Sequence, residues 1–221
     1  MERRYAEMIR AVLFDLDGTV FDTEKIYYRS WVRAAEAVGF KGDMHKVMPL
    51  IFGVSESDIG KYFYGNYGED FPYTEMLSKR AEFIAEEIEM GGVPLKDGVP
   101  EIFEWLTKKG IACALVSSAP RFRIDDFLER AGLSQAFRCI ISGERVEKSK
   151  PAPDIFLLAA NEVGVAPDEC LVAEDSKNGV LAGYSAGMQV AMIPDLQPFS
   201  EDLRPYVTYL LTSLREIENI L

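Results

Sequence analysis

Short runs of apolar, strand-favouring residues recur along this chain and alternate with segments that have helical spacing. The runs are AVLFDL, ACALVSS, RCIISG, ECLVAED and VAMIP, at residues 11–16, 112–118, 138–143, 169–175 and 190–194, with YLLTS at 209–213 as a candidate sixth. Strands that are apolar on both faces and alternate with helices are typical of a parallel sheet covered on both sides. The pattern predicts an α/β fold with a Rossmann-like core.

One interval breaks this alternation, because residues 22–92 carry helical patterns and no convincing strand. A short helix is predicted within residues 55–68. Longer apolar stripes lie on either side of it, at Tyr27, Trp31, Ala34, Ala35 and Val38, and at Leu77, Ala81, Ile84, Ala85 and Ile88. Glycines follow each stripe and are typical helix stops. We therefore predict a helical domain at 22–92, inserted into a core formed by residues 1–21 and 93–221.

Composition narrows the possible functions. The 221-residue chain is 48% hydrophobic, enough for a sizeable core, and its net charge of −12 argues against nucleic acid or anionic membranes as partners. No apolar stretch approaches the ~20 residues that span a bilayer, and no export signal is visible, so a cytoplasmic location is expected. Three cysteines in apolar runs suggest buried thiols. The single histidine, His45, is expected on the surface, so catalysis would use carboxylates, lysine and hydroxyls.

Acidic residues follow two of the predicted strands. Asp15 and Asp17 end the first run, and Glu174 and Asp175 end the fourth. In an open parallel sheet, ligands bind at the carboxyl ends of the strands, so the four carboxylates are expected to converge. Carboxylates packed so closely repel each other unless some are protonated or a cation is bound. Hard oxygen ligands suit Mg²⁺, which is the cofactor we predict.

Two further strand ends carry groups that complement this cluster. Ser117 ends the second run, and Lys150 follows the third, just before Pro151 and Pro153. Pro153 is expected at the first position of the next helix. A hydroxyl, a lysine and a divalent cation can together hold the oxygens of a phosphoryl group. Each residue alone has an ordinary structural explanation, but their joint occurrence at predicted strand ends favours a phosphoryl-transfer site.

These residues resemble, in order, the motifs of the haloacid dehalogenase (HAD) superfamily. The resemblance runs through DLDGT at 15–19, Ser117, KPAPDIF at 150–156, EDS at 174–176, Gly179 and AGM at 186–188, and so covers nearly the whole chain. It implies that the helical insertion is a small C1-type cap and that the nearest group is the phosphatases and β-phosphoglucomutases. Dehalogenases and phosphonate-cleaving relatives depart from the Asp-x-Asp pattern, so Asp17 argues against both activities.

The resemblance also implies a role for each residue. Asp15 would be the nucleophile that forms an aspartyl-phosphate, and Asp17 the general acid and base. Mg²⁺ would be bound by the Asp15 carboxylate, the Asp17 main-chain carbonyl and the Asp175 carboxylate, with Glu174 acting through a water molecule. Ser117 and Lys150 would hold the phosphoryl oxygens. Together these roles predict a monomeric, Mg²⁺-dependent phosphatase that acts on a small phosphomonoester such as a sugar phosphate.

Two alternatives stay open. β-Phosphoglucomutases share this core and carry a phosphate-gripping arginine just after a Gly-Val-Ser segment, whereas this chain has Glu56 there, which favours hydrolysis. Arg121 and Arg123 are the basic residues that keep a mutase possible, although solvated positions at a helix start explain them better. A non-enzymatic phospho-receiver would be smaller and would have no cap. Within the cap, Phe52, Val54, Ser55 and Glu56 are candidate substrate contacts.

Overall fold

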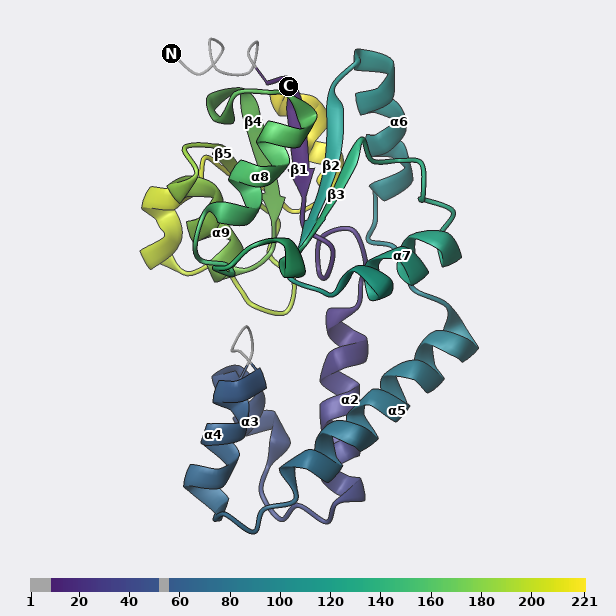
Figure 1. The fold of residues 1–221 in the computed structure, drawn as a ribbon, viewed down its shortest axis with the longest axis vertical. Coiled ribbons are helices and arrows are strands. Elements are labelled where there is room, and N and C mark those ends of the chain that lie inside the picture. The colour runs from purple at the N-terminus through teal and green to yellow at the C-terminus, as the bar shows by residue number, and fades with distance from the viewer. Residues whose placement is uncertain (1–8, 52–55) are drawn as a thin grey trace. The chain divides into compact units, whose positions relative to one another are not determined.

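The computed structural model describes residues 9–51 and 56–221 (Figure 1). The chain divides into two compact units, one formed by Met1–Asp22 with Val93–Leu221 and the other by Thr23–Gly92. Among the described residues, no helix has the length and apolar character needed to cross a bilayer.

The first unit contains a six-stranded sheet. Its strands are β1 (Ala11–Phe14), β2 (Ala112–Ser117), β3 (Cys139–Ser142), β4 (Cys170–Glu174), β5 (Gln189–Met192) and β6 (Tyr209–Leu210). They lie in the order β3-β2-β1-β4-β5-β6, and every neighbouring pair is parallel. The predicted α/β class is therefore confirmed, and the five strong apolar runs and the candidate sixth run all form strands.

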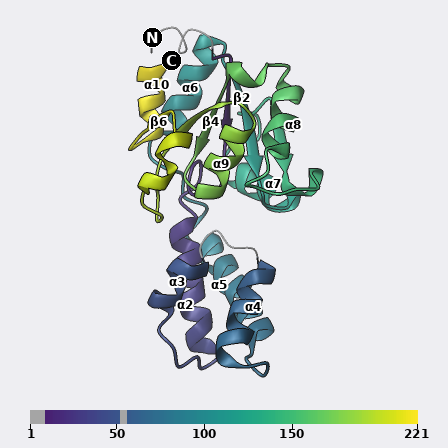
Figure 2. The ribbon, with the colours of Figure 1, turned by 90° about the vertical axis from the view of Figure 1, so that its left-hand side faces the viewer.

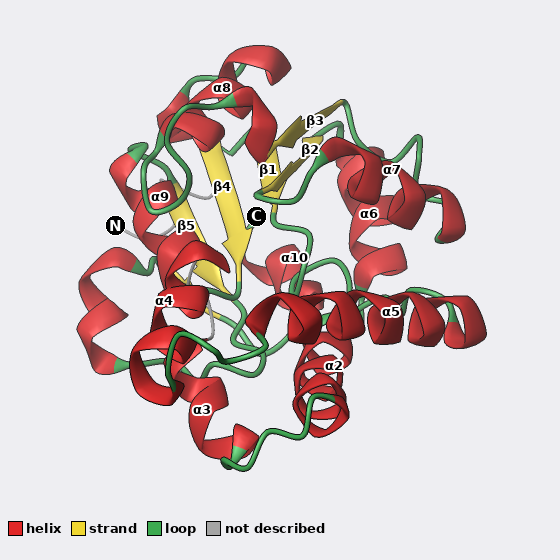
Figure 3. Ribbon diagram, turned by 60° about the horizontal axis from the view of Figure 1, so that its bottom comes forward, coloured by secondary structure: helices red, strands yellow, loops and turns green. Residues whose placement is uncertain are grey.

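Helices cover both faces of this sheet (Figure 3). They are α6 (Val99–Lys109), α7 (Arg121–Arg130), α8 (Asp154–Val163), α9 (Lys177–Ser185) and α10 (Ile217–Ile220), with 3₁₀ turns at Gly143–Arg145, Pro167–Glu169, Glu201–Tyr206 and Leu214–Glu216. Successive side chains of a strand point to opposite faces. Leu13 accordingly joins the core beneath α8 and α9, whereas the Phe14 ring packs edge-on against Phe103 of α6 with centroids 5.0 Å apart.

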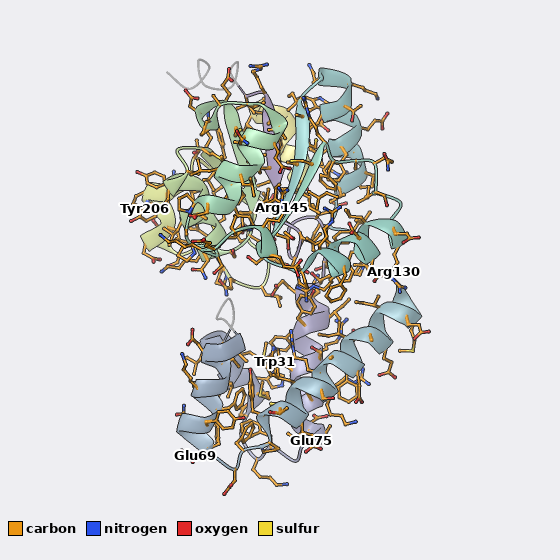
Figure 4. The ribbon with its side chains drawn as sticks, viewed as in Figure 1. Trp31, Glu69, Glu75, Arg130, Arg145 and Tyr206 are labelled. Atoms are coloured by element: carbon orange, nitrogen blue, oxygen red, sulfur yellow. The ribbon has the colours of Figure 1, made fainter. Side chains whose placement is uncertain are left out.

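The second unit is all-helical (Figure 2). It consists of α2 (Glu24–Ala37), α3 (Met44–Ile51), α4 (Glu56–Tyr67) and α5 (Tyr73–Gly91). Trp31 lies among the side chains of its core (Figure 4), together with Phe63 and Met76. The Phe63 ring stacks on Phe71 with centroids 4.9 Å apart. Aromatic packing thus gives this small unit a core of its own.

Several local predictions were wrong. Helix α3, which contains Pro49, forms where no helix was predicted. On α5, Ile88 of the predicted stripe is buried, but Ala81 and Ala85 are exposed, and Tyr73 and Met76 are buried with Ile88. The expected stripe was displaced because small alanines do not determine which face of a helix is buried. Pro153 is the N-cap of α8 and not its first residue.

The single histidine and the cysteines lie as expected from the sequence, with one exception. His45 is exposed. Cys113 and Cys170 are buried and free, and Cys139 is also free but only half-buried. Burial raises the pKa of Cys113 to about 12, so this thiol is protonated and unreactive at neutral pH.

The segments on either side of the helical unit pair with each other inside the first unit. Phe21 and Leu95 form an antiparallel bridge, and the Asp22 amide donates to the Pro94 carbonyl at 2.8 Å. The Lys96 ammonium lies 2.9 Å from the Asp195 carboxylate in the loop after β5. The two chain segments that connect the units, around Asp22 and Pro94, are therefore hydrogen-bonded to each other within the first unit.

Candidate active site

The register of the three central strands places the acidic residues together. β1 lies between β2 and β4, and Phe14 pairs with Ala173 of β4. The next residues along these strands are Asp15 and Glu174, at the carboxyl edge of the sheet. The Asp15 amide continues the ladder by donating to the Ala173 carbonyl at 3.0 Å. Gly18, with φ of 79°, then turns the chain in a conformation that side chains disfavour.

Lys150 connects the two acidic strand ends. Its Nζ donates to Asp15 Oδ1 at 2.5 Å and to Glu174 Oε1 at 2.7 Å. A further contact reaches the Val116 carbonyl of β2 at 3.3 Å. The Lys150 side chain is only 7% exposed, so these interactions occur away from bulk solvent. Lys150 thus contacts residues at the ends of all three central strands. Its positive charge compensates the negative charges of the buried carboxylates of Asp15 and Glu174.

Glu174 is held by more contacts than the sequence suggested. Its Oε2 accepts hydrogen bonds from the Asp175 amide at 3.0 Å, and from the Ser176 amide and hydroxyl at 2.9 Å each. Ser176 also caps α9 by accepting from the Gly179 amide at 3.1 Å. A Cβ at Gly179 would lie 1.7 Å from Glu174 Oε1. Only glycine leaves room for this carboxylate.

Burial and charge act against each other in the Asp15–Lys150 pair. Burial raises the pKa of Asp15 from its ordinary 3.8 to about 8; the charge of Lys150 opposes this shift, and Glu174 adds to it. Burial opposes charging of Lys150, but the attraction of Asp15 and Glu174 outweighs it and raises the lysine pKa. Lys150 is therefore a cation, and Asp15 needs more positive charge to be fully ionised at neutral pH.

Three carboxylates form a site with the dimensions of a metal centre. Asp15, Glu174 and Asp175 are all buried, and each offers a carboxylate oxygen within 4.8 Å of the others. One lysine cannot balance these three charges, so the excess negative charge fits a hard divalent cation. The four hydrogen bonds on Glu174 commit its oxygens to protein groups. Asp15 and Asp175 are the better candidates for direct ligands.

Ser117 and Asp17 border this cluster. Ser117 is the last residue of β2, is 2% exposed and accepts a hydrogen bond from the Ala119 amide at 3.0 Å. It directly follows Val116, the residue whose carbonyl binds Lys150. Asp17 is more open, at 19% side-chain exposure, and its Oδ2 lies 3.9 Å from Arg123 Nη2.

Sequence reasoning missed two features of this site. Arg123 was treated as a solvated residue at a helix start, and nothing in the sequence signalled its approach to Asp17. Gly179 was noted only as part of the motif, without its steric reason. Of the candidate cap contacts, Phe52, Val54 and Ser55 lie outside the described residues. Glu56 is the first residue of α4, and its side chain also lies outside the description.

Comparisons with known proteins agree with this geometry. Residues 12–193 match the family described as haloacid dehalogenase-like hydrolase. The chain is 33% identical to a phosphorylated carbohydrates phosphatase of Thermotoga maritima, over 82% of this chain and 83% of the relative. It is also 33% identical to hexitol phosphatase A of Escherichia coli, over 83% of this chain and 82% of the relative.

A solved structure from Thermotoga maritima, provisionally assigned as a β-phosphoglucomutase, superposes with a TM-score of 0.78. It is 28% identical, and the match covers 96% of this chain and 98% of that one. The family match agrees with the α/β sheet and with the acidic residues at its strand ends. The chain belongs to the haloacid dehalogenase-like hydrolase family, and the predicted resemblance is confirmed.

Proposed function

We propose that this protein is a Mg²⁺-dependent phosphatase that hydrolyses a small phosphorylated metabolite through an aspartyl-phosphate intermediate. The observation that carries this proposal is the position of Lys150 between Asp15 and Glu174, beside Asp175, at the carboxyl edge of the sheet. A buried carboxylate with a fixed lysine beside it is equipped for nucleophilic attack on a bound phosphoryl group. The phosphatase relatives support the same reaction.

The proposed metal ligands are the carboxylates of Asp15 and Asp175 and the main-chain carbonyl of Asp17, with Glu174 acting indirectly. Bound Mg²⁺ would supply positive charge that attracts the phosphoryl oxygens and favours the ionised form of Asp15. Four carboxylates and Lys150 otherwise leave an excess of negative charge, which would repel a phosphate monoester. The raised pKa of Asp15 supports the need for a cation.

Chemistry in this proposal occurs in two steps. An Asp15 carboxylate oxygen attacks phosphorus while the bond to the leaving oxygen breaks, and Asp17 donates a proton to that oxygen. Asp17 then accepts a proton from water as the water oxygen attacks phosphorus and the bond to Asp15 breaks. Ser117 and Lys150 hold the phosphoryl oxygens in both steps. The alcohol and inorganic phosphate leave as products.

The helical unit is proposed to act as a cap that selects the leaving group. The boundaries predicted from the sequence, 22–92 for the cap and 1–21 with 93–221 for the core, stay a proposal. So do the contacts suggested for Phe52, Val54, Ser55 and Glu56. A sugar phosphate is the favoured substrate class because two phosphatase relatives are named for carbohydrate and hexitol substrates. Monomeric state and cytoplasmic location likewise stay predictions.

A phosphosugar mutase is the second candidate. The β-phosphoglucomutase-assigned structure shares this fold over nearly its whole length, which favours a related active site. A mutase must bind a bisphosphate intermediate, whereas the sequence has Glu56 at the motif position where a mutase has a phosphate-gripping arginine. Incubation with both anomers of glucose 1-phosphate separates the candidates, because a mutase yields glucose 6-phosphate and a phosphatase yields glucose and inorganic phosphate.

The main experiment is a screen of phosphorylated metabolites for phosphate release with Mg²⁺ and with excess chelator. We expect turnover only with the metal, and full activity in chelator would refute the metal requirement. The variant Asp15→Asn should abolish turnover of every substrate because the amide is a poor nucleophile. Asp168→Asn, a change at an exposed carboxylate in the Pro167–Glu169 turn, is the matched control.

A further inference from the structure

Arg123 occupies a defined position beside Asp17. Its Nη2 lies 3.9 Å from Asp17 Oδ2, beyond direct hydrogen-bond distance but close enough for attraction between the charges. The Arg123 side chain is 37% exposed and that of Asp17 19% exposed, so the pair lies at the opening of the site and not in its buried centre. The two residues belong to the same unit, so the contact is internal to that unit.

Packing explains why the arginine is held in this place. Helix α7 follows β2 directly, and its first amide, that of Arg121, donates to Glu144 Oε2 at 2.8 Å. The Phe127 ring of α7 packs edge-on against Phe21 with centroids 5.6 Å apart. Phe21 closes the turn that carries Asp17, because its carbonyl accepts from the Gly18 amide. The helix bearing Arg123 and the turn bearing Asp17 are therefore packed on each other.

The cations of the site are divided between its acids. Lys150 contacts Asp15 and Glu174, and no contact between Lys150 and Asp17 is among those described. Arg121 pairs with Asp125 at 2.8 Å, one turn along α7. The ion pair described for Asp17 is the one with Arg123. An arginine is well suited to this because its planar guanidinium stays charged and has several donors.

We infer that Arg123 is a positioning residue that orients the Asp17 carboxyl group for proton transfer to the leaving oxygen. This inference rests on the proposed phosphatase reaction, in which Asp17 is the general acid and base. Proton transfer needs the donor within hydrogen-bond reach of the leaving oxygen, so a poorly oriented carboxyl group loses most of its benefit. In this role Arg123 acts through Asp17 and makes no contact with phosphorus or the leaving oxygen.

The inference predicts an effect that depends on the leaving group. A p-nitrophenolate ion leaves without being protonated, whereas the alkoxide of a sugar does not. For Arg123→Gln, we expect kcat/KM for a sugar phosphate to fall by about 10- to 100-fold, a part of what general acid catalysis contributes. For p-nitrophenyl phosphate, kcat/KM should change by less than about threefold, since formation of the aspartyl-phosphate from this ester needs no acid.

Three variants sharpen this measurement. Arg121→Gln makes the same chemical change two residues away and should behave as the wild type. Arg123→Lys keeps the charge and should recover part of the lost activity; it also serves as the test if Arg123→Gln folds poorly by thermal unfolding. In an Asp17→Asn background, Arg123→Gln should cause no further loss of kcat/KM on the sugar phosphate, because the group on which it acts is gone.

Other outcomes would overturn the inference. An equal loss on both substrates, or additive losses in the double variant, would mean that Arg123 does not act through Asp17. A rise in KM confined to substrates with a second anionic group, such as a sugar bisphosphate, would make Arg123 a substrate ligand instead. The proposed function fails separately: if Asp15→Asn retains turnover of p-nitrophenyl phosphate, the nucleophile is wrong whatever Arg123 does.

Discussion

Gly179 offers a sharp test of the site because a single methyl group there would enter the space of Glu174. A Cβ at Gly179 would lie 1.7 Å from Oε1 and 1.8 Å from Cδ of that carboxylate. Ordinary contacts of this kind are at least 3.4 Å, so Gly179→Ala requires the carboxylate to move by more than 1 Å. Such a movement breaks hydrogen bonds, since these lengthen beyond their working range within a few tenths of an ångström.

The cost can be worked out from the contacts that Glu174 makes. Its oxygens accept from Lys150 Nζ, the Asp175 amide and the Ser176 amide and hydroxyl. Hydrogen bonds to charged groups contribute about 1.5–3 kcal/mol each, and about two would be lost or weakened. The gain of replacing glycine by alanine within a helix offsets about 1 kcal/mol. We expect the free energy of unfolding to fall by about 2–5 kcal/mol.

The assay combines urea unfolding, Mg²⁺ titration and phosphate release. Gly179→Ala should weaken Mg²⁺ binding and turnover as well as stability, because Lys150 loses one of the two carboxylates that hold it. Gly183→Ala in the same helix is the matched control: its Cβ would meet only Val172 and Val190 side chains, at 3.1 Å. It should lower stability and leave Mg²⁺ binding unchanged. Wild-type stability and metal binding in Gly179→Ala would refute the reasoning.

Three further predictions follow from the same site. Because the pKa of Asp15 is raised to about 8, the folded state favours its protonated form, and the metal-free protein should lose stability as pH rises from about 4 through 8. Mg²⁺ should restore this stability and release a proton from Asp15. Calorimetry in buffers of different ionisation enthalpy measures the released proton. Absence of proton release would contradict the raised pKa. Lys150→Gln should reduce turnover by at least about 100-fold and lower stability, because two buried carboxylates lose their partner; circular dichroism checks that the fold remains. A stiffening substitution at the Phe21–Thr23 joint that keeps the Asp22 amide should reduce kcat, and unchanged steady-state kinetics would argue against cap movement during turnover.

The sequence determined the fold class and the family, for reasons that are local. In a chain where they alternate with helices, apolar runs such as 11–16 and 169–175 form strands that are buried on both faces of a parallel sheet. Chain order then placed the acidic residues at strand ends. The motifs around Asp15, Lys150 and Glu174 were visible because each is a short segment with its own chemistry. The roles given to these residues stay predictions.

Tertiary structure decided everything that depends on distance between separate segments. Arg123 approaches Asp17 because α7 packs on the turn that carries the acid, and no local pattern contains that contact. Gly179 is required because a carboxylate from the preceding strand occupies the space beside it. The buried face of α5 was likewise set by its neighbours, since alanine buries too little apolar area to choose a face. Periodicity identifies elements, whereas packing decides which of their side chains meet.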